Sequence, residues 1–288
     1  MFHVRKIESL SAPELQPYAT LRRSRDHETQ GIFVAEGTKV VLRLLESDFA
    51  VESVVLPENW LPQFQALLEK RPEDVPVYLA QKKLLESLTG FSMFQGVLAV
   101  GKIPAPVSLE KILASSPHPQ LFVAVDALTN AENLGALVRN CVAFGAHALI
   151  AGETSSSPFL RRSVRNSMGT ILQLPVIELA RLGQWRKPNV TSHTTDLTLV
   201  ECLKDFRTRG IRCIAAHPHT DKKILSQTDF RGDCCIVFGS EGDGISPAVL
   251  AACDEAVAIP MPPHVDSLNV AAAAAVFLYE ANRQRNAF

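Results

Sequence analysis

The sequence lacks any apolar segment long enough to cross a membrane. A membrane-spanning helix needs about 20 consecutive apolar residues, whereas the longest candidate, residues 268–279, contains Asn269 and is followed by Glu280. The first nine residues carry Arg5, Lys6 and Glu8 without an apolar stretch behind them, so they do not match a secretory signal. These absences exclude the membrane-embedded classes, and we expect a cytoplasmic protein with no membrane partner.

The sequence also lacks a paired-cysteine motif. Its six cysteines all lie between residues 141 and 253, within or beside apolar stretches, and no CxxC pair occurs. We therefore expect reduced thiols in a protein core. His217 and His219 flank Pro218, but no third ligand stands at a suitable spacing, so we expect an exposed turn there and no metal site.

A strong excess of one charge is missing too. The chain has 29 Lys and Arg against 30 Asp and Glu, with a net charge of −1 and a pI near 6.7. This balance gives no overall electrostatic attraction for nucleic acid. Any contact with RNA must depend on local clusters, and the candidates are Arg22, Arg23 and Arg25, and Arg161, Arg162 and Arg165.

The composition that is present indicates a globular protein of two domains. The chain has 288 residues, of which 47% are hydrophobic, enough for a sizeable core. A stretch rich in Pro and Ser at residues 102–120 separates two segments with alternating strand and helix patterns. We predict an N-terminal domain at residues 1–105, a linker at 106–119 and a C-terminal domain at 120–288.

The N-terminal segment reads as a small α/β sandwich of roughly 100 residues. Its expected strands are residues 31–35, 51–56, 75–79 and 96–100, and its expected helices include residues 38–45 and 61–70.

The C-terminal segment contains nearly continuous apolar strands separated by helices or long loops, at residues 121–125, 148–151, 211–215, 234–238 and 256–259. This alternation predicts a parallel sheet that is covered on both faces. Gly145 and Gly210 are placed to end two of the helices. Ligands of such sheets bind beyond the carboxyl ends of the strands, so the loops after Asp126, Phe238 and Ile259 are the candidate site.

The loop after Phe238 runs from Gly239 to Gly244 and is rich in glycine and acidic residues. The GxGxxG spacing of dinucleotide sites is absent, and Glu241 and Asp243 would repel a pyrophosphate. S-adenosylmethionine carries a sulfonium and an amino group but no phosphate, so it suits this loop better. A tight acidic turn without a ligand is the alternative.

Arg139 lies one helical turn after Gly135 in the segment that follows Asp126. Long side chains lean toward the helix N-terminus, which would direct the guanidinium toward the free N–H groups near Asn133, where a phosphate is favoured. The alternative is a solvated arginine, with Asn133 as a helix cap.

The loop at residues 259–269 is restrained by three prolines. Met261 and Leu268 can therefore present apolar walls or backbone groups in a fixed shape, whereas Ser267 and Asn269 are also explained as helix caps. Five alanines at residues 271–275 permit close approach of another helix and are compatible with a homodimer. His264 is a less favoured general base.

Together, these segments resemble the three motifs of the SpoU (TrmH-like) family in the SPOUT superfamily of RNA methyltransferases. Motif one matches Asn133, Gly135, Arg139, Phe144 and Gly145; motif two matches Phe238, Gly239, Glu241, Gly242 and Gly244; motif three matches Ile259, Pro260, Met261, Ser267, Leu268 and Asn269. Between the first two, residues 167–169 resemble the serine-glycine element of the family.

The resemblance implies a parallel-sheet domain with a deep trefoil knot, an S-adenosylmethionine cofactor and a homodimer. It implies catalytic roles for Arg139, Asn133, Glu241, Ser267 and Asn269. It places the cofactor against Gly239, Glu241, Gly244, Ile259, Met261, Ser267 and Leu268.

The N-terminal segment resembles the accessory substrate-binding domain of the same family, a small α/β fold related to certain ribosomal proteins. Residues 31–37 and 95–100 carry this likeness. The implied reaction is methylation of a ribose 2′-hydroxyl in structured RNA, with 23S-type ribosomal RNA as the first expectation and tRNA as the alternative. A dinucleotide-dependent oxidoreductase and a non-catalytic RNA-binding protein are the competing classes.

Overall fold

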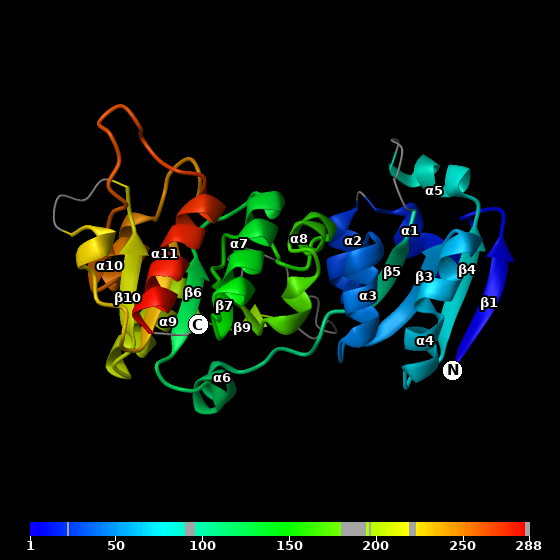
Figure 1. Ribbon diagram of the computed structural model, residues 1–288, viewed down its shortest axis with the longest axis horizontal. Helices are drawn as coiled ribbons and strands as arrows, with labels where there is room; N and C mark the ends of the chain where they lie inside the picture. The colour runs from blue at the N-terminus through cyan, green and yellow to red at the C-terminus, as the bar shows by residue number, and fades with distance from the viewer. Residues whose placement is uncertain (22, 90–95, 180–193, 196, 219–222, 286–288) are drawn as a thin grey trace. The chain divides into compact units, whose positions relative to one another are not determined.

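The structure is a computed structural model that describes residues 1–21, 23–89, 96–179, 194–195, 197–218 and 223–285. Arg22, Gln95 and His219, named above, lie outside the described residues. The chain forms two compact units, shown in Figure 1. The first comprises Met1–Pro104 with Phe159–Leu172, and the second comprises Ala105–Pro158 with Gln173–Phe288.

The first unit contains a five-stranded sheet in the order β1-β4-β3-β5-β2. Its strands are β1 (Phe2–Ile7), β2 (Ile32–Glu36), β3 (Val51–Leu56), β4 (Val75–Ala80) and β5 (Leu98–Lys102). β1, β4 and β3 are parallel, whereas β5 is antiparallel to both β3 and β2. The four expected strands are confirmed, but β1 was not predicted, because this edge strand has no buried residue to mark it.

The helices of the first unit are α1 (Gln16–Ala19), α2 (Ser24–Gln30), α3 (Thr38–Glu46), α4 (Leu61–Lys70) and α5 (Lys82–Thr89). α3 and α4 lie where the apolar periodicity predicted them. One side of the core is closed by Tyr18, which is fully buried and shares a 2.8 Å hydrogen bond with the Ser53 hydroxyl. Burial and the loss of hydration raise the pKa of Tyr18 far above its ordinary value.

The inserted segment Phe159–Leu172 carries α8 (Arg161–Asn166). Arg161 and Arg165 both pair with the Glu36 carboxylate, whose side chain is only 8% exposed. The Arg43 guanidinium donates to the Met168 carbonyl at 2.5 Å. A buried carboxylate such as that of Glu36 requires a paired positive charge. Arg161 and Arg165, two of the arginines expected to contact RNA, therefore form ion pairs inside the protein.

The second unit contains a seven-stranded sheet in the order β12-β10-β11-β6-β7-β8-β9. Its strands are β6 (Leu121–Val125), β7 (Ala148–Ala151), β8 (Val176–Leu179), β9 (Thr194–Thr195), β10 (Arg212–Ala216), β11 (Cys234–Phe238) and β12 (Glu255–Val257). Every strand pair is parallel, which confirms the predicted parallel sheet.

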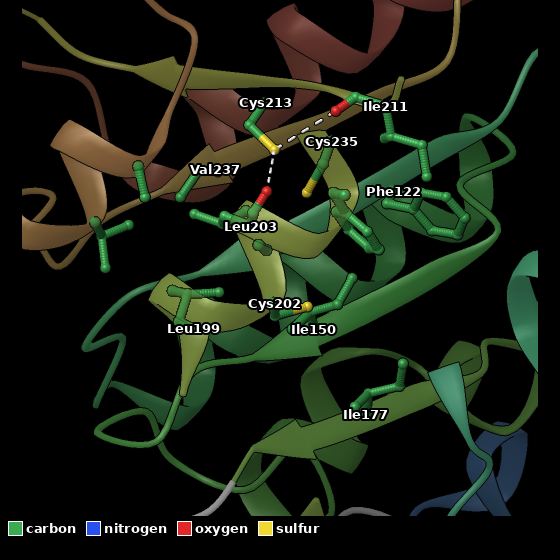
Figure 2. Packing of buried hydrophobic residues seen from close by; sticks show 14 of the residues in the cluster. Phe122, Ile150, Ile177, Leu199, Cys202, Leu203, Ile211, Cys213, Cys235 and Val237 are labelled. Atoms are coloured by element: carbon green, nitrogen blue, oxygen red, sulfur yellow. Dashed lines mark hydrogen bonds between the residues drawn. The ribbon is translucent and has the colours of Figure 1, made fainter. Parts of the chain in front are cut away.

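One face of this sheet packs against α6 (Leu109–Ser115), α9 (Leu199–Thr208) and α10 (Pro247–Ala252). Figure 2 shows the centre of this core, where Cys202, Cys213 and Cys235 lie among leucine, isoleucine and phenylalanine side chains. All six cysteines are free thiols, as predicted. Burial raises the pKa of Cys202 to about 12, so its thiol is unreactive at neutral pH.

Helix α6 falls within the stretch that was expected to be a linker, residues 106–119. Its Leu109 and Ile112 side chains are buried in the core just described. Ser108 caps the helix by accepting from the Lys111 N–H at 3.2 Å. This stretch therefore contributes to the second unit.

The opposite face of the sheet packs against α7 (Ala131–Ala143) and α11 (Val270–Gln284), which lie side by side in Figure 1. Phe238, at the end of β11, meets the ring of Phe277 edge to face, with ring centroids 5.8 Å apart. Gly145 follows α7 at a φ of 69° and Gly210 follows α9 at 78°. Both glycines adopt the left-handed conformation expected at helix ends.

Candidate active site

A pocket of about 380 Å³ opens at the carboxyl ends of β10, β11 and β12. It is formed by the segments after these strands and by the first turns of α11. Its lining residues are Ala216, His217, Pro218, Phe238, Gly239, Ser240, Glu241, Gly242, Asp243, Gly244, Val257, Ile259, Met261, Asp266, Ser267, Leu268, Val270, Ala273 and Phe277. All seven residues that the resemblance assigned to the cofactor are among them.

The loop after β11 folds back on itself within six residues. The Ser240 N–H donates to the Gly244 carbonyl at 2.9 Å, and the Gly244 N–H returns a bond to the Ser240 carbonyl at 3.2 Å. A Cβ atom on Gly239 would lie 2.1 Å from the Gly244 carbonyl carbon, and Gly244 has a φ of +70°. Glycine is therefore required at Gly239 by close backbone approach and is favoured at Gly244 by the positive φ.

Asp126, the residue directly after β6, holds this loop in place through two hydrogen bonds. Its carboxylate accepts from the Ser246 N–H at 2.7 Å, and its own N–H donates to the Phe238 carbonyl at 2.8 Å. The Asp126 residue is only 6% exposed. The sequence indicated the position after β6 but not this role, because the bond joins residues 120 positions apart.

The apolar side of the pocket comes from α11. Val270, Ala273 and Phe277 line it, and Val270 and Phe277 are buried. The sequence does not mark these three residues as part of a site, because helical periodicity assigns such residues to a core. Met261 and Leu268, from the loop after β12, face the same pocket; Leu268 is 40% exposed.

A hydrogen bond joins motif one to motif three. The Asn269 side-chain amide donates to the Asn133 Oδ1 at 3.1 Å. Asn269 also caps α11, since its Oδ1 accepts from the N–H groups of Ala271 and Ala272. The cap of α7 is Asn130 rather than Asn133, because the Asn130 Oδ1 accepts from the Glu132 and Asn133 N–H groups at 2.9 and 3.2 Å. The Asn133 side chain is thereby left for the contact with Asn269.

Arg139 lies on the exposed surface of α7. Its guanidinium has no hydrogen-bond or ion-pair partner among the described residues, and it is not part of the pocket lining. Ser267 lies in the lining and is exposed. The structure therefore brings Asn133, Asn269, Ser267 and Glu241 to one end of the sheet, and leaves Arg139 as an unpaired cation on the helix that begins there.

The pocket is acidic. Glu241, Asp243 and Asp266 line it, whereas no lysine or arginine of the described chain does. His217 and Pro218 also line the pocket, so the expected exposed turn at Pro218 is part of a wall of the site. Within the described residues, no group of three or more His, Cys, Asp and Glu side chains is arranged to hold a metal ion.

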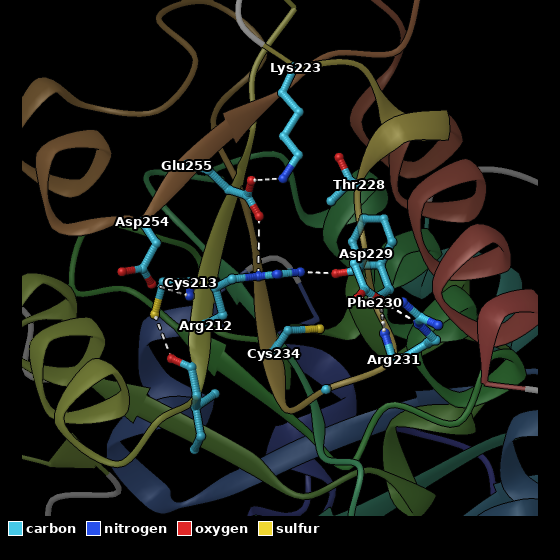
Figure 3. A network of polar contacts seen from close by, with 12 residues as sticks. Arg212, Cys213, Lys223, Thr228, Asp229, Phe230, Arg231, Cys234, Asp254 and Glu255 are labelled. Atoms are coloured by element: carbon cyan, nitrogen blue, oxygen red, sulfur yellow. Dashed lines mark hydrogen bonds and ion pairs between the residues drawn. The ribbon is translucent and has the colours of Figure 1, made fainter.

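Backbone hydrogen bonds join the segments before and after Pro218 to β12 and to the residue that follows it. The His217 N–H donates to the Val257 carbonyl at 3.0 Å, and the Ala258 N–H donates to the Lys223 carbonyl at 3.0 Å. Figure 3 shows Glu255 of β12 between Lys223 and Arg212, with N···O distances of 2.5 and 3.2 Å. This partly buried network holds the strand ends that form the pocket.

No helix in the described ranges is long and apolar enough to cross a membrane.

Ligands of open parallel sheets bind beyond the carboxyl ends of the strands, and the three acidic residues that line this pocket favour a ligand with positive charge over a phosphate. The chain belongs to the SpoU rRNA methylase family, whose model matches residues 120–197 and 180–279. Residues 13–99 match the MRM3-like substrate binding domain.

Relatives and solved structures agree with this assignment. A tRNA/rRNA methyltransferase of Mycobacterium tuberculosis, described as uncharacterized, is 31% identical over 260 residues, which cover 88% of this chain and 82% of the relative. The 23S rRNA (guanosine-2′-O-)-methyltransferase RlmB of Ralstonia nicotianae is 30% identical over 208 residues, or 72% of this chain and 76% of the relative. The SpoU methyltransferase AviRb of Streptomyces viridochromogenes, solved with the cofactor AdoMet, is 26% identical, with a TM-score of 0.77 over 96% of this chain and 100% of its own.

The chain is therefore an RNA methyltransferase that uses S-adenosylmethionine. The residues of the pocket fit this cofactor, because three carboxylates face a ligand with sulfonium and ammonium charges while apolar side chains from α11 face its uncharged parts. Figure 1 places α11, drawn in red, directly beside α7 of motif one.

Proposed function

We propose that this enzyme methylates a ribose 2′-hydroxyl of RNA. The observation that carries the proposal is the bond between Asn133 and Asn269, which joins the N-terminus of α7 to the pocket lined by the loops after β11 and β12. A hydroxyl placed at this junction would face the methyl donor and the N-terminus of α7.

S-adenosylmethionine supplies an electrophilic methyl group on a sulfonium, so little activation of the donor is needed. A ribose hydroxyl is a weak nucleophile, and the work of the protein is alignment and stabilisation of the developing alkoxide. The Arg139 guanidinium keeps its proton at neutral pH, and we assign it to that stabilisation and to the adjacent phosphate. Asn133, Glu241, Ser267 and Asn269 would orient the ribose, whose hydroxyl proton leaves to water as the O–C bond forms.

Replacement of Arg139 by lysine tests this assignment. We expect Arg139→Lys to lose most of the turnover, because lysine lacks the planar fork that contacts the hydroxyl and phosphate together. The affinity for S-adenosylmethionine should stay unchanged in calorimetry, since Arg139 does not line the pocket. A near-native rate would reject the role given to Arg139.

We further propose a homodimer that forms through α7 and α11. Support comes from the apolar side chains exposed there: Val276 is 40% exposed, and Tyr279 is 53% exposed and packs on Phe144. In a dimer, Arg139 of one subunit would serve the pocket of the partner. Mixing inactive Arg139→Ala and Gly239→Ala chains should then restore part of the activity, whereas sites contained within one chain would give no recovery.

We also propose the trefoil knot that the family resemblance implies. β12 lies at the edge of the sheet beside β10, yet α11 packs on α7 and on Phe238 of β11, the third strand of the sheet. The chain must return from the edge strand to the inner strands between residues 258 and 269. This route supports a knot, and mechanical stretching between the two termini would test it: a knotted chain stops short of its full contour length.

For the substrate, we propose 23S-type ribosomal RNA, with tRNA as the alternative. Support comes from the name of the Ralstonia nicotianae relative and from the match to a substrate binding domain. Mapping of 2′-O-methyl positions in cells with and without the gene identifies the RNA. Loss of a single position in 23S rRNA is the expected result; loss of a tRNA position favours the alternative, and an unchanged map of both rejects the proposal.

A further inference from the structure

A second cleft lies in the first unit, beyond the carboxyl ends of its three parallel strands β1, β3 and β4. Its volume is about 700 Å³, within the range of roughly 300 to 1,000 Å³ that small-ligand sites occupy. We infer that this cleft binds one unpaired nucleotide of the RNA substrate. The inference rests on the proposed function for the choice of ligand, and on the following contacts for the site.

The floor of the cleft is apolar and the walls are polar. Leu79 and Ala80, at the end of β4, are buried beneath it, and Pro57 closes one side. Unpaired bases in RNA are recognised by contact of their flat faces with protein surfaces and by hydrogen bonds to their edges. An apolar floor between polar walls offers both kinds of contact.

Two amide side chains provide the polar contacts. Asn59, in the short helix after β3, and Gln81, directly after β4, both line the cleft, and both are exposed. Neither side chain has a hydrogen-bond partner among the described residues. An amide presents donors and an acceptor together, which matches the edge of a nucleobase better than it matches a simple anion.

The lysines at the cleft form ion pairs with glutamates, and these pairs are exposed to solvent. Lys6 pairs with Glu58 at 3.0 Å, with both side chains more than 60% exposed, and Lys82 pairs with Glu86 at 3.7 Å. Exposed pairs of this kind contribute little to stability, so a phosphate can replace the carboxylate partner of either lysine. Glu8 also lines the cleft, and this balance of charge favours a site that depends on the base over one that depends on phosphate alone.

One wall of the cleft is formed by β1, at the N-terminal end of the first unit. Lys6 and Ile7 belong to β1, which lies outside the residues 13–99 that match the substrate-binding family. β1 pairs with β4 along its whole length, from Phe2 with Val75 to Ile7 with Ala80. β1 therefore extends the sheet, and its end contributes Lys6 and Ile7 to the cleft. A paired base cannot enter a cleft of this kind, since its edge and faces are occupied in the duplex.

The test is RNA binding by the full-length protein, measured by fluorescence anisotropy with a labelled hairpin whose loop is unpaired. The double variant Asn59→Ala with Gln81→Ala should bind the hairpin about tenfold more weakly, because two hydrogen bonds to the base are lost. The matched control, Gln30→Ala with Gln63→Ala, removes two exposed amides outside the cleft and should leave the affinity unchanged. A fully paired duplex should bind the wild type and the double variant equally.

Photocrosslinking gives a second readout. A hairpin with 4-thiouridine in its loop should crosslink to peptides that contain Asn59 or Gln81. Equal affinity of the double variant and the wild type, or crosslinks confined to the second unit, would overturn the inference. Methyl transfer that persists in that case leaves the proposed function standing, whereas a cleft that binds RNA in a protein with no transfer activity would reject the proposed function alone.

Discussion

The side chains of Asn133 and Asn269 are 136 positions apart in sequence and form a 3.1 Å hydrogen bond. Two further asparagines continue the connection between the same helices: Asn140 donates to the Ala271 carbonyl at 2.6 Å, and Asn282 donates to the Phe144 carbonyl at 3.0 Å. The three bonds fix the position of α11 along α7. Because α11 forms one wall of the pocket, the alignment of cofactor and substrate depends on them.

A double-mutant cycle measures the bond between the two asparagines. We expect Asn269→Ala to lower the free energy of unfolding by about 1 to 2 kcal/mol, because it removes a helix cap as well as the bond. Asn133→Ala should cost about 1 kcal/mol. The double variant should cost less than the sum, with a coupling of at least about 0.5 kcal/mol in urea unfolding.

The matched cycle uses Ser108→Ala, which removes the cap of α6 on the opposite face of the sheet from α7 and α11. Its effect should add to that of Asn269→Ala. Additivity in both cycles would show that the Asn133 bond makes no contribution in solution.

Gly239→Ala should abolish binding of S-adenosylmethionine. The added methyl group would overlap the Gly244 backbone, which cannot yield as the end of a flexible side chain can. The loop after β11 would have to open, and we expect a loss of affinity of at least about 100-fold in calorimetry, from removal of the preorganised backbone contacts. Gly232→Ala is the control, since a Cβ there meets no atom within 4 Å; equal losses in both variants would exclude the steric explanation.

The acidic lining should distinguish the cofactor from its demethylated product. S-adenosylhomocysteine lacks the sulfonium charge, so Asp266→Asn should weaken binding of S-adenosylmethionine more than binding of the product. We expect a difference of about two- to fivefold at low salt, because the carboxylate is exposed and screened. Asp48→Asn makes the same change of net charge in the first unit and should alter neither affinity; an equal effect of Asp266→Asn on both ligands would contradict the prediction.

His147 should make the protein less stable in acid. Burial lowers the pKa of His147 below its ordinary value of 6.5, and its Nδ1 accepts from the Leu121 N–H at 3.0 Å. The folded state therefore binds fewer protons than the unfolded state below pH 6.5, and stability falls as the pH drops through the lowered pKa. Above pH 6.5 this contribution is fully present.

Urea midpoints at pH 7.5, 6.5 and 5.5 test this prediction. His147→Asn keeps an acceptor for Leu121 and cannot titrate, so it should lose less stability between pH 6.5 and 5.5 than the wild type does. His264→Asn, at an exposed position, should follow the wild type. A parallel decline of His147→Asn and the wild type would show that another group is responsible.

Much of the fold was predictable because its strands are apolar throughout or are bounded by clear turn signals. The buried run of residues 121–125 and the glycine after α7 gave correct boundaries. β1 was missed because it has no buried side, and α6 was hidden by its proline-rich surroundings. The commitment of Arg161 to Glu36 was not predictable either, since local sequence carries no information on a partner 125 residues away.

The site was predictable where residue type and motif coincide. Gly239 and Glu241 lie where the motifs indicate, at the pocket. The sequence did not identify Asp126 or Phe277 as parts of the site, because a buried aspartate and a helical phenylalanine have ordinary structural explanations. It did not assign His217 to the site either: the expected turn at Pro218 is an exposed bend, but only the sheet order brings His217 beside the loop after β11.

Methylation of the ribose is tested most directly by mass analysis of the nucleosides released from RNA after reaction with the purified enzyme and methyl-labelled S-adenosylmethionine. We expect label on the ribose of one 2′-O-methylnucleoside, and this label should disappear with the Gly239→Ala and Arg139→Lys variants. Label on a base, or ribose label that both variants still produce, would contradict it.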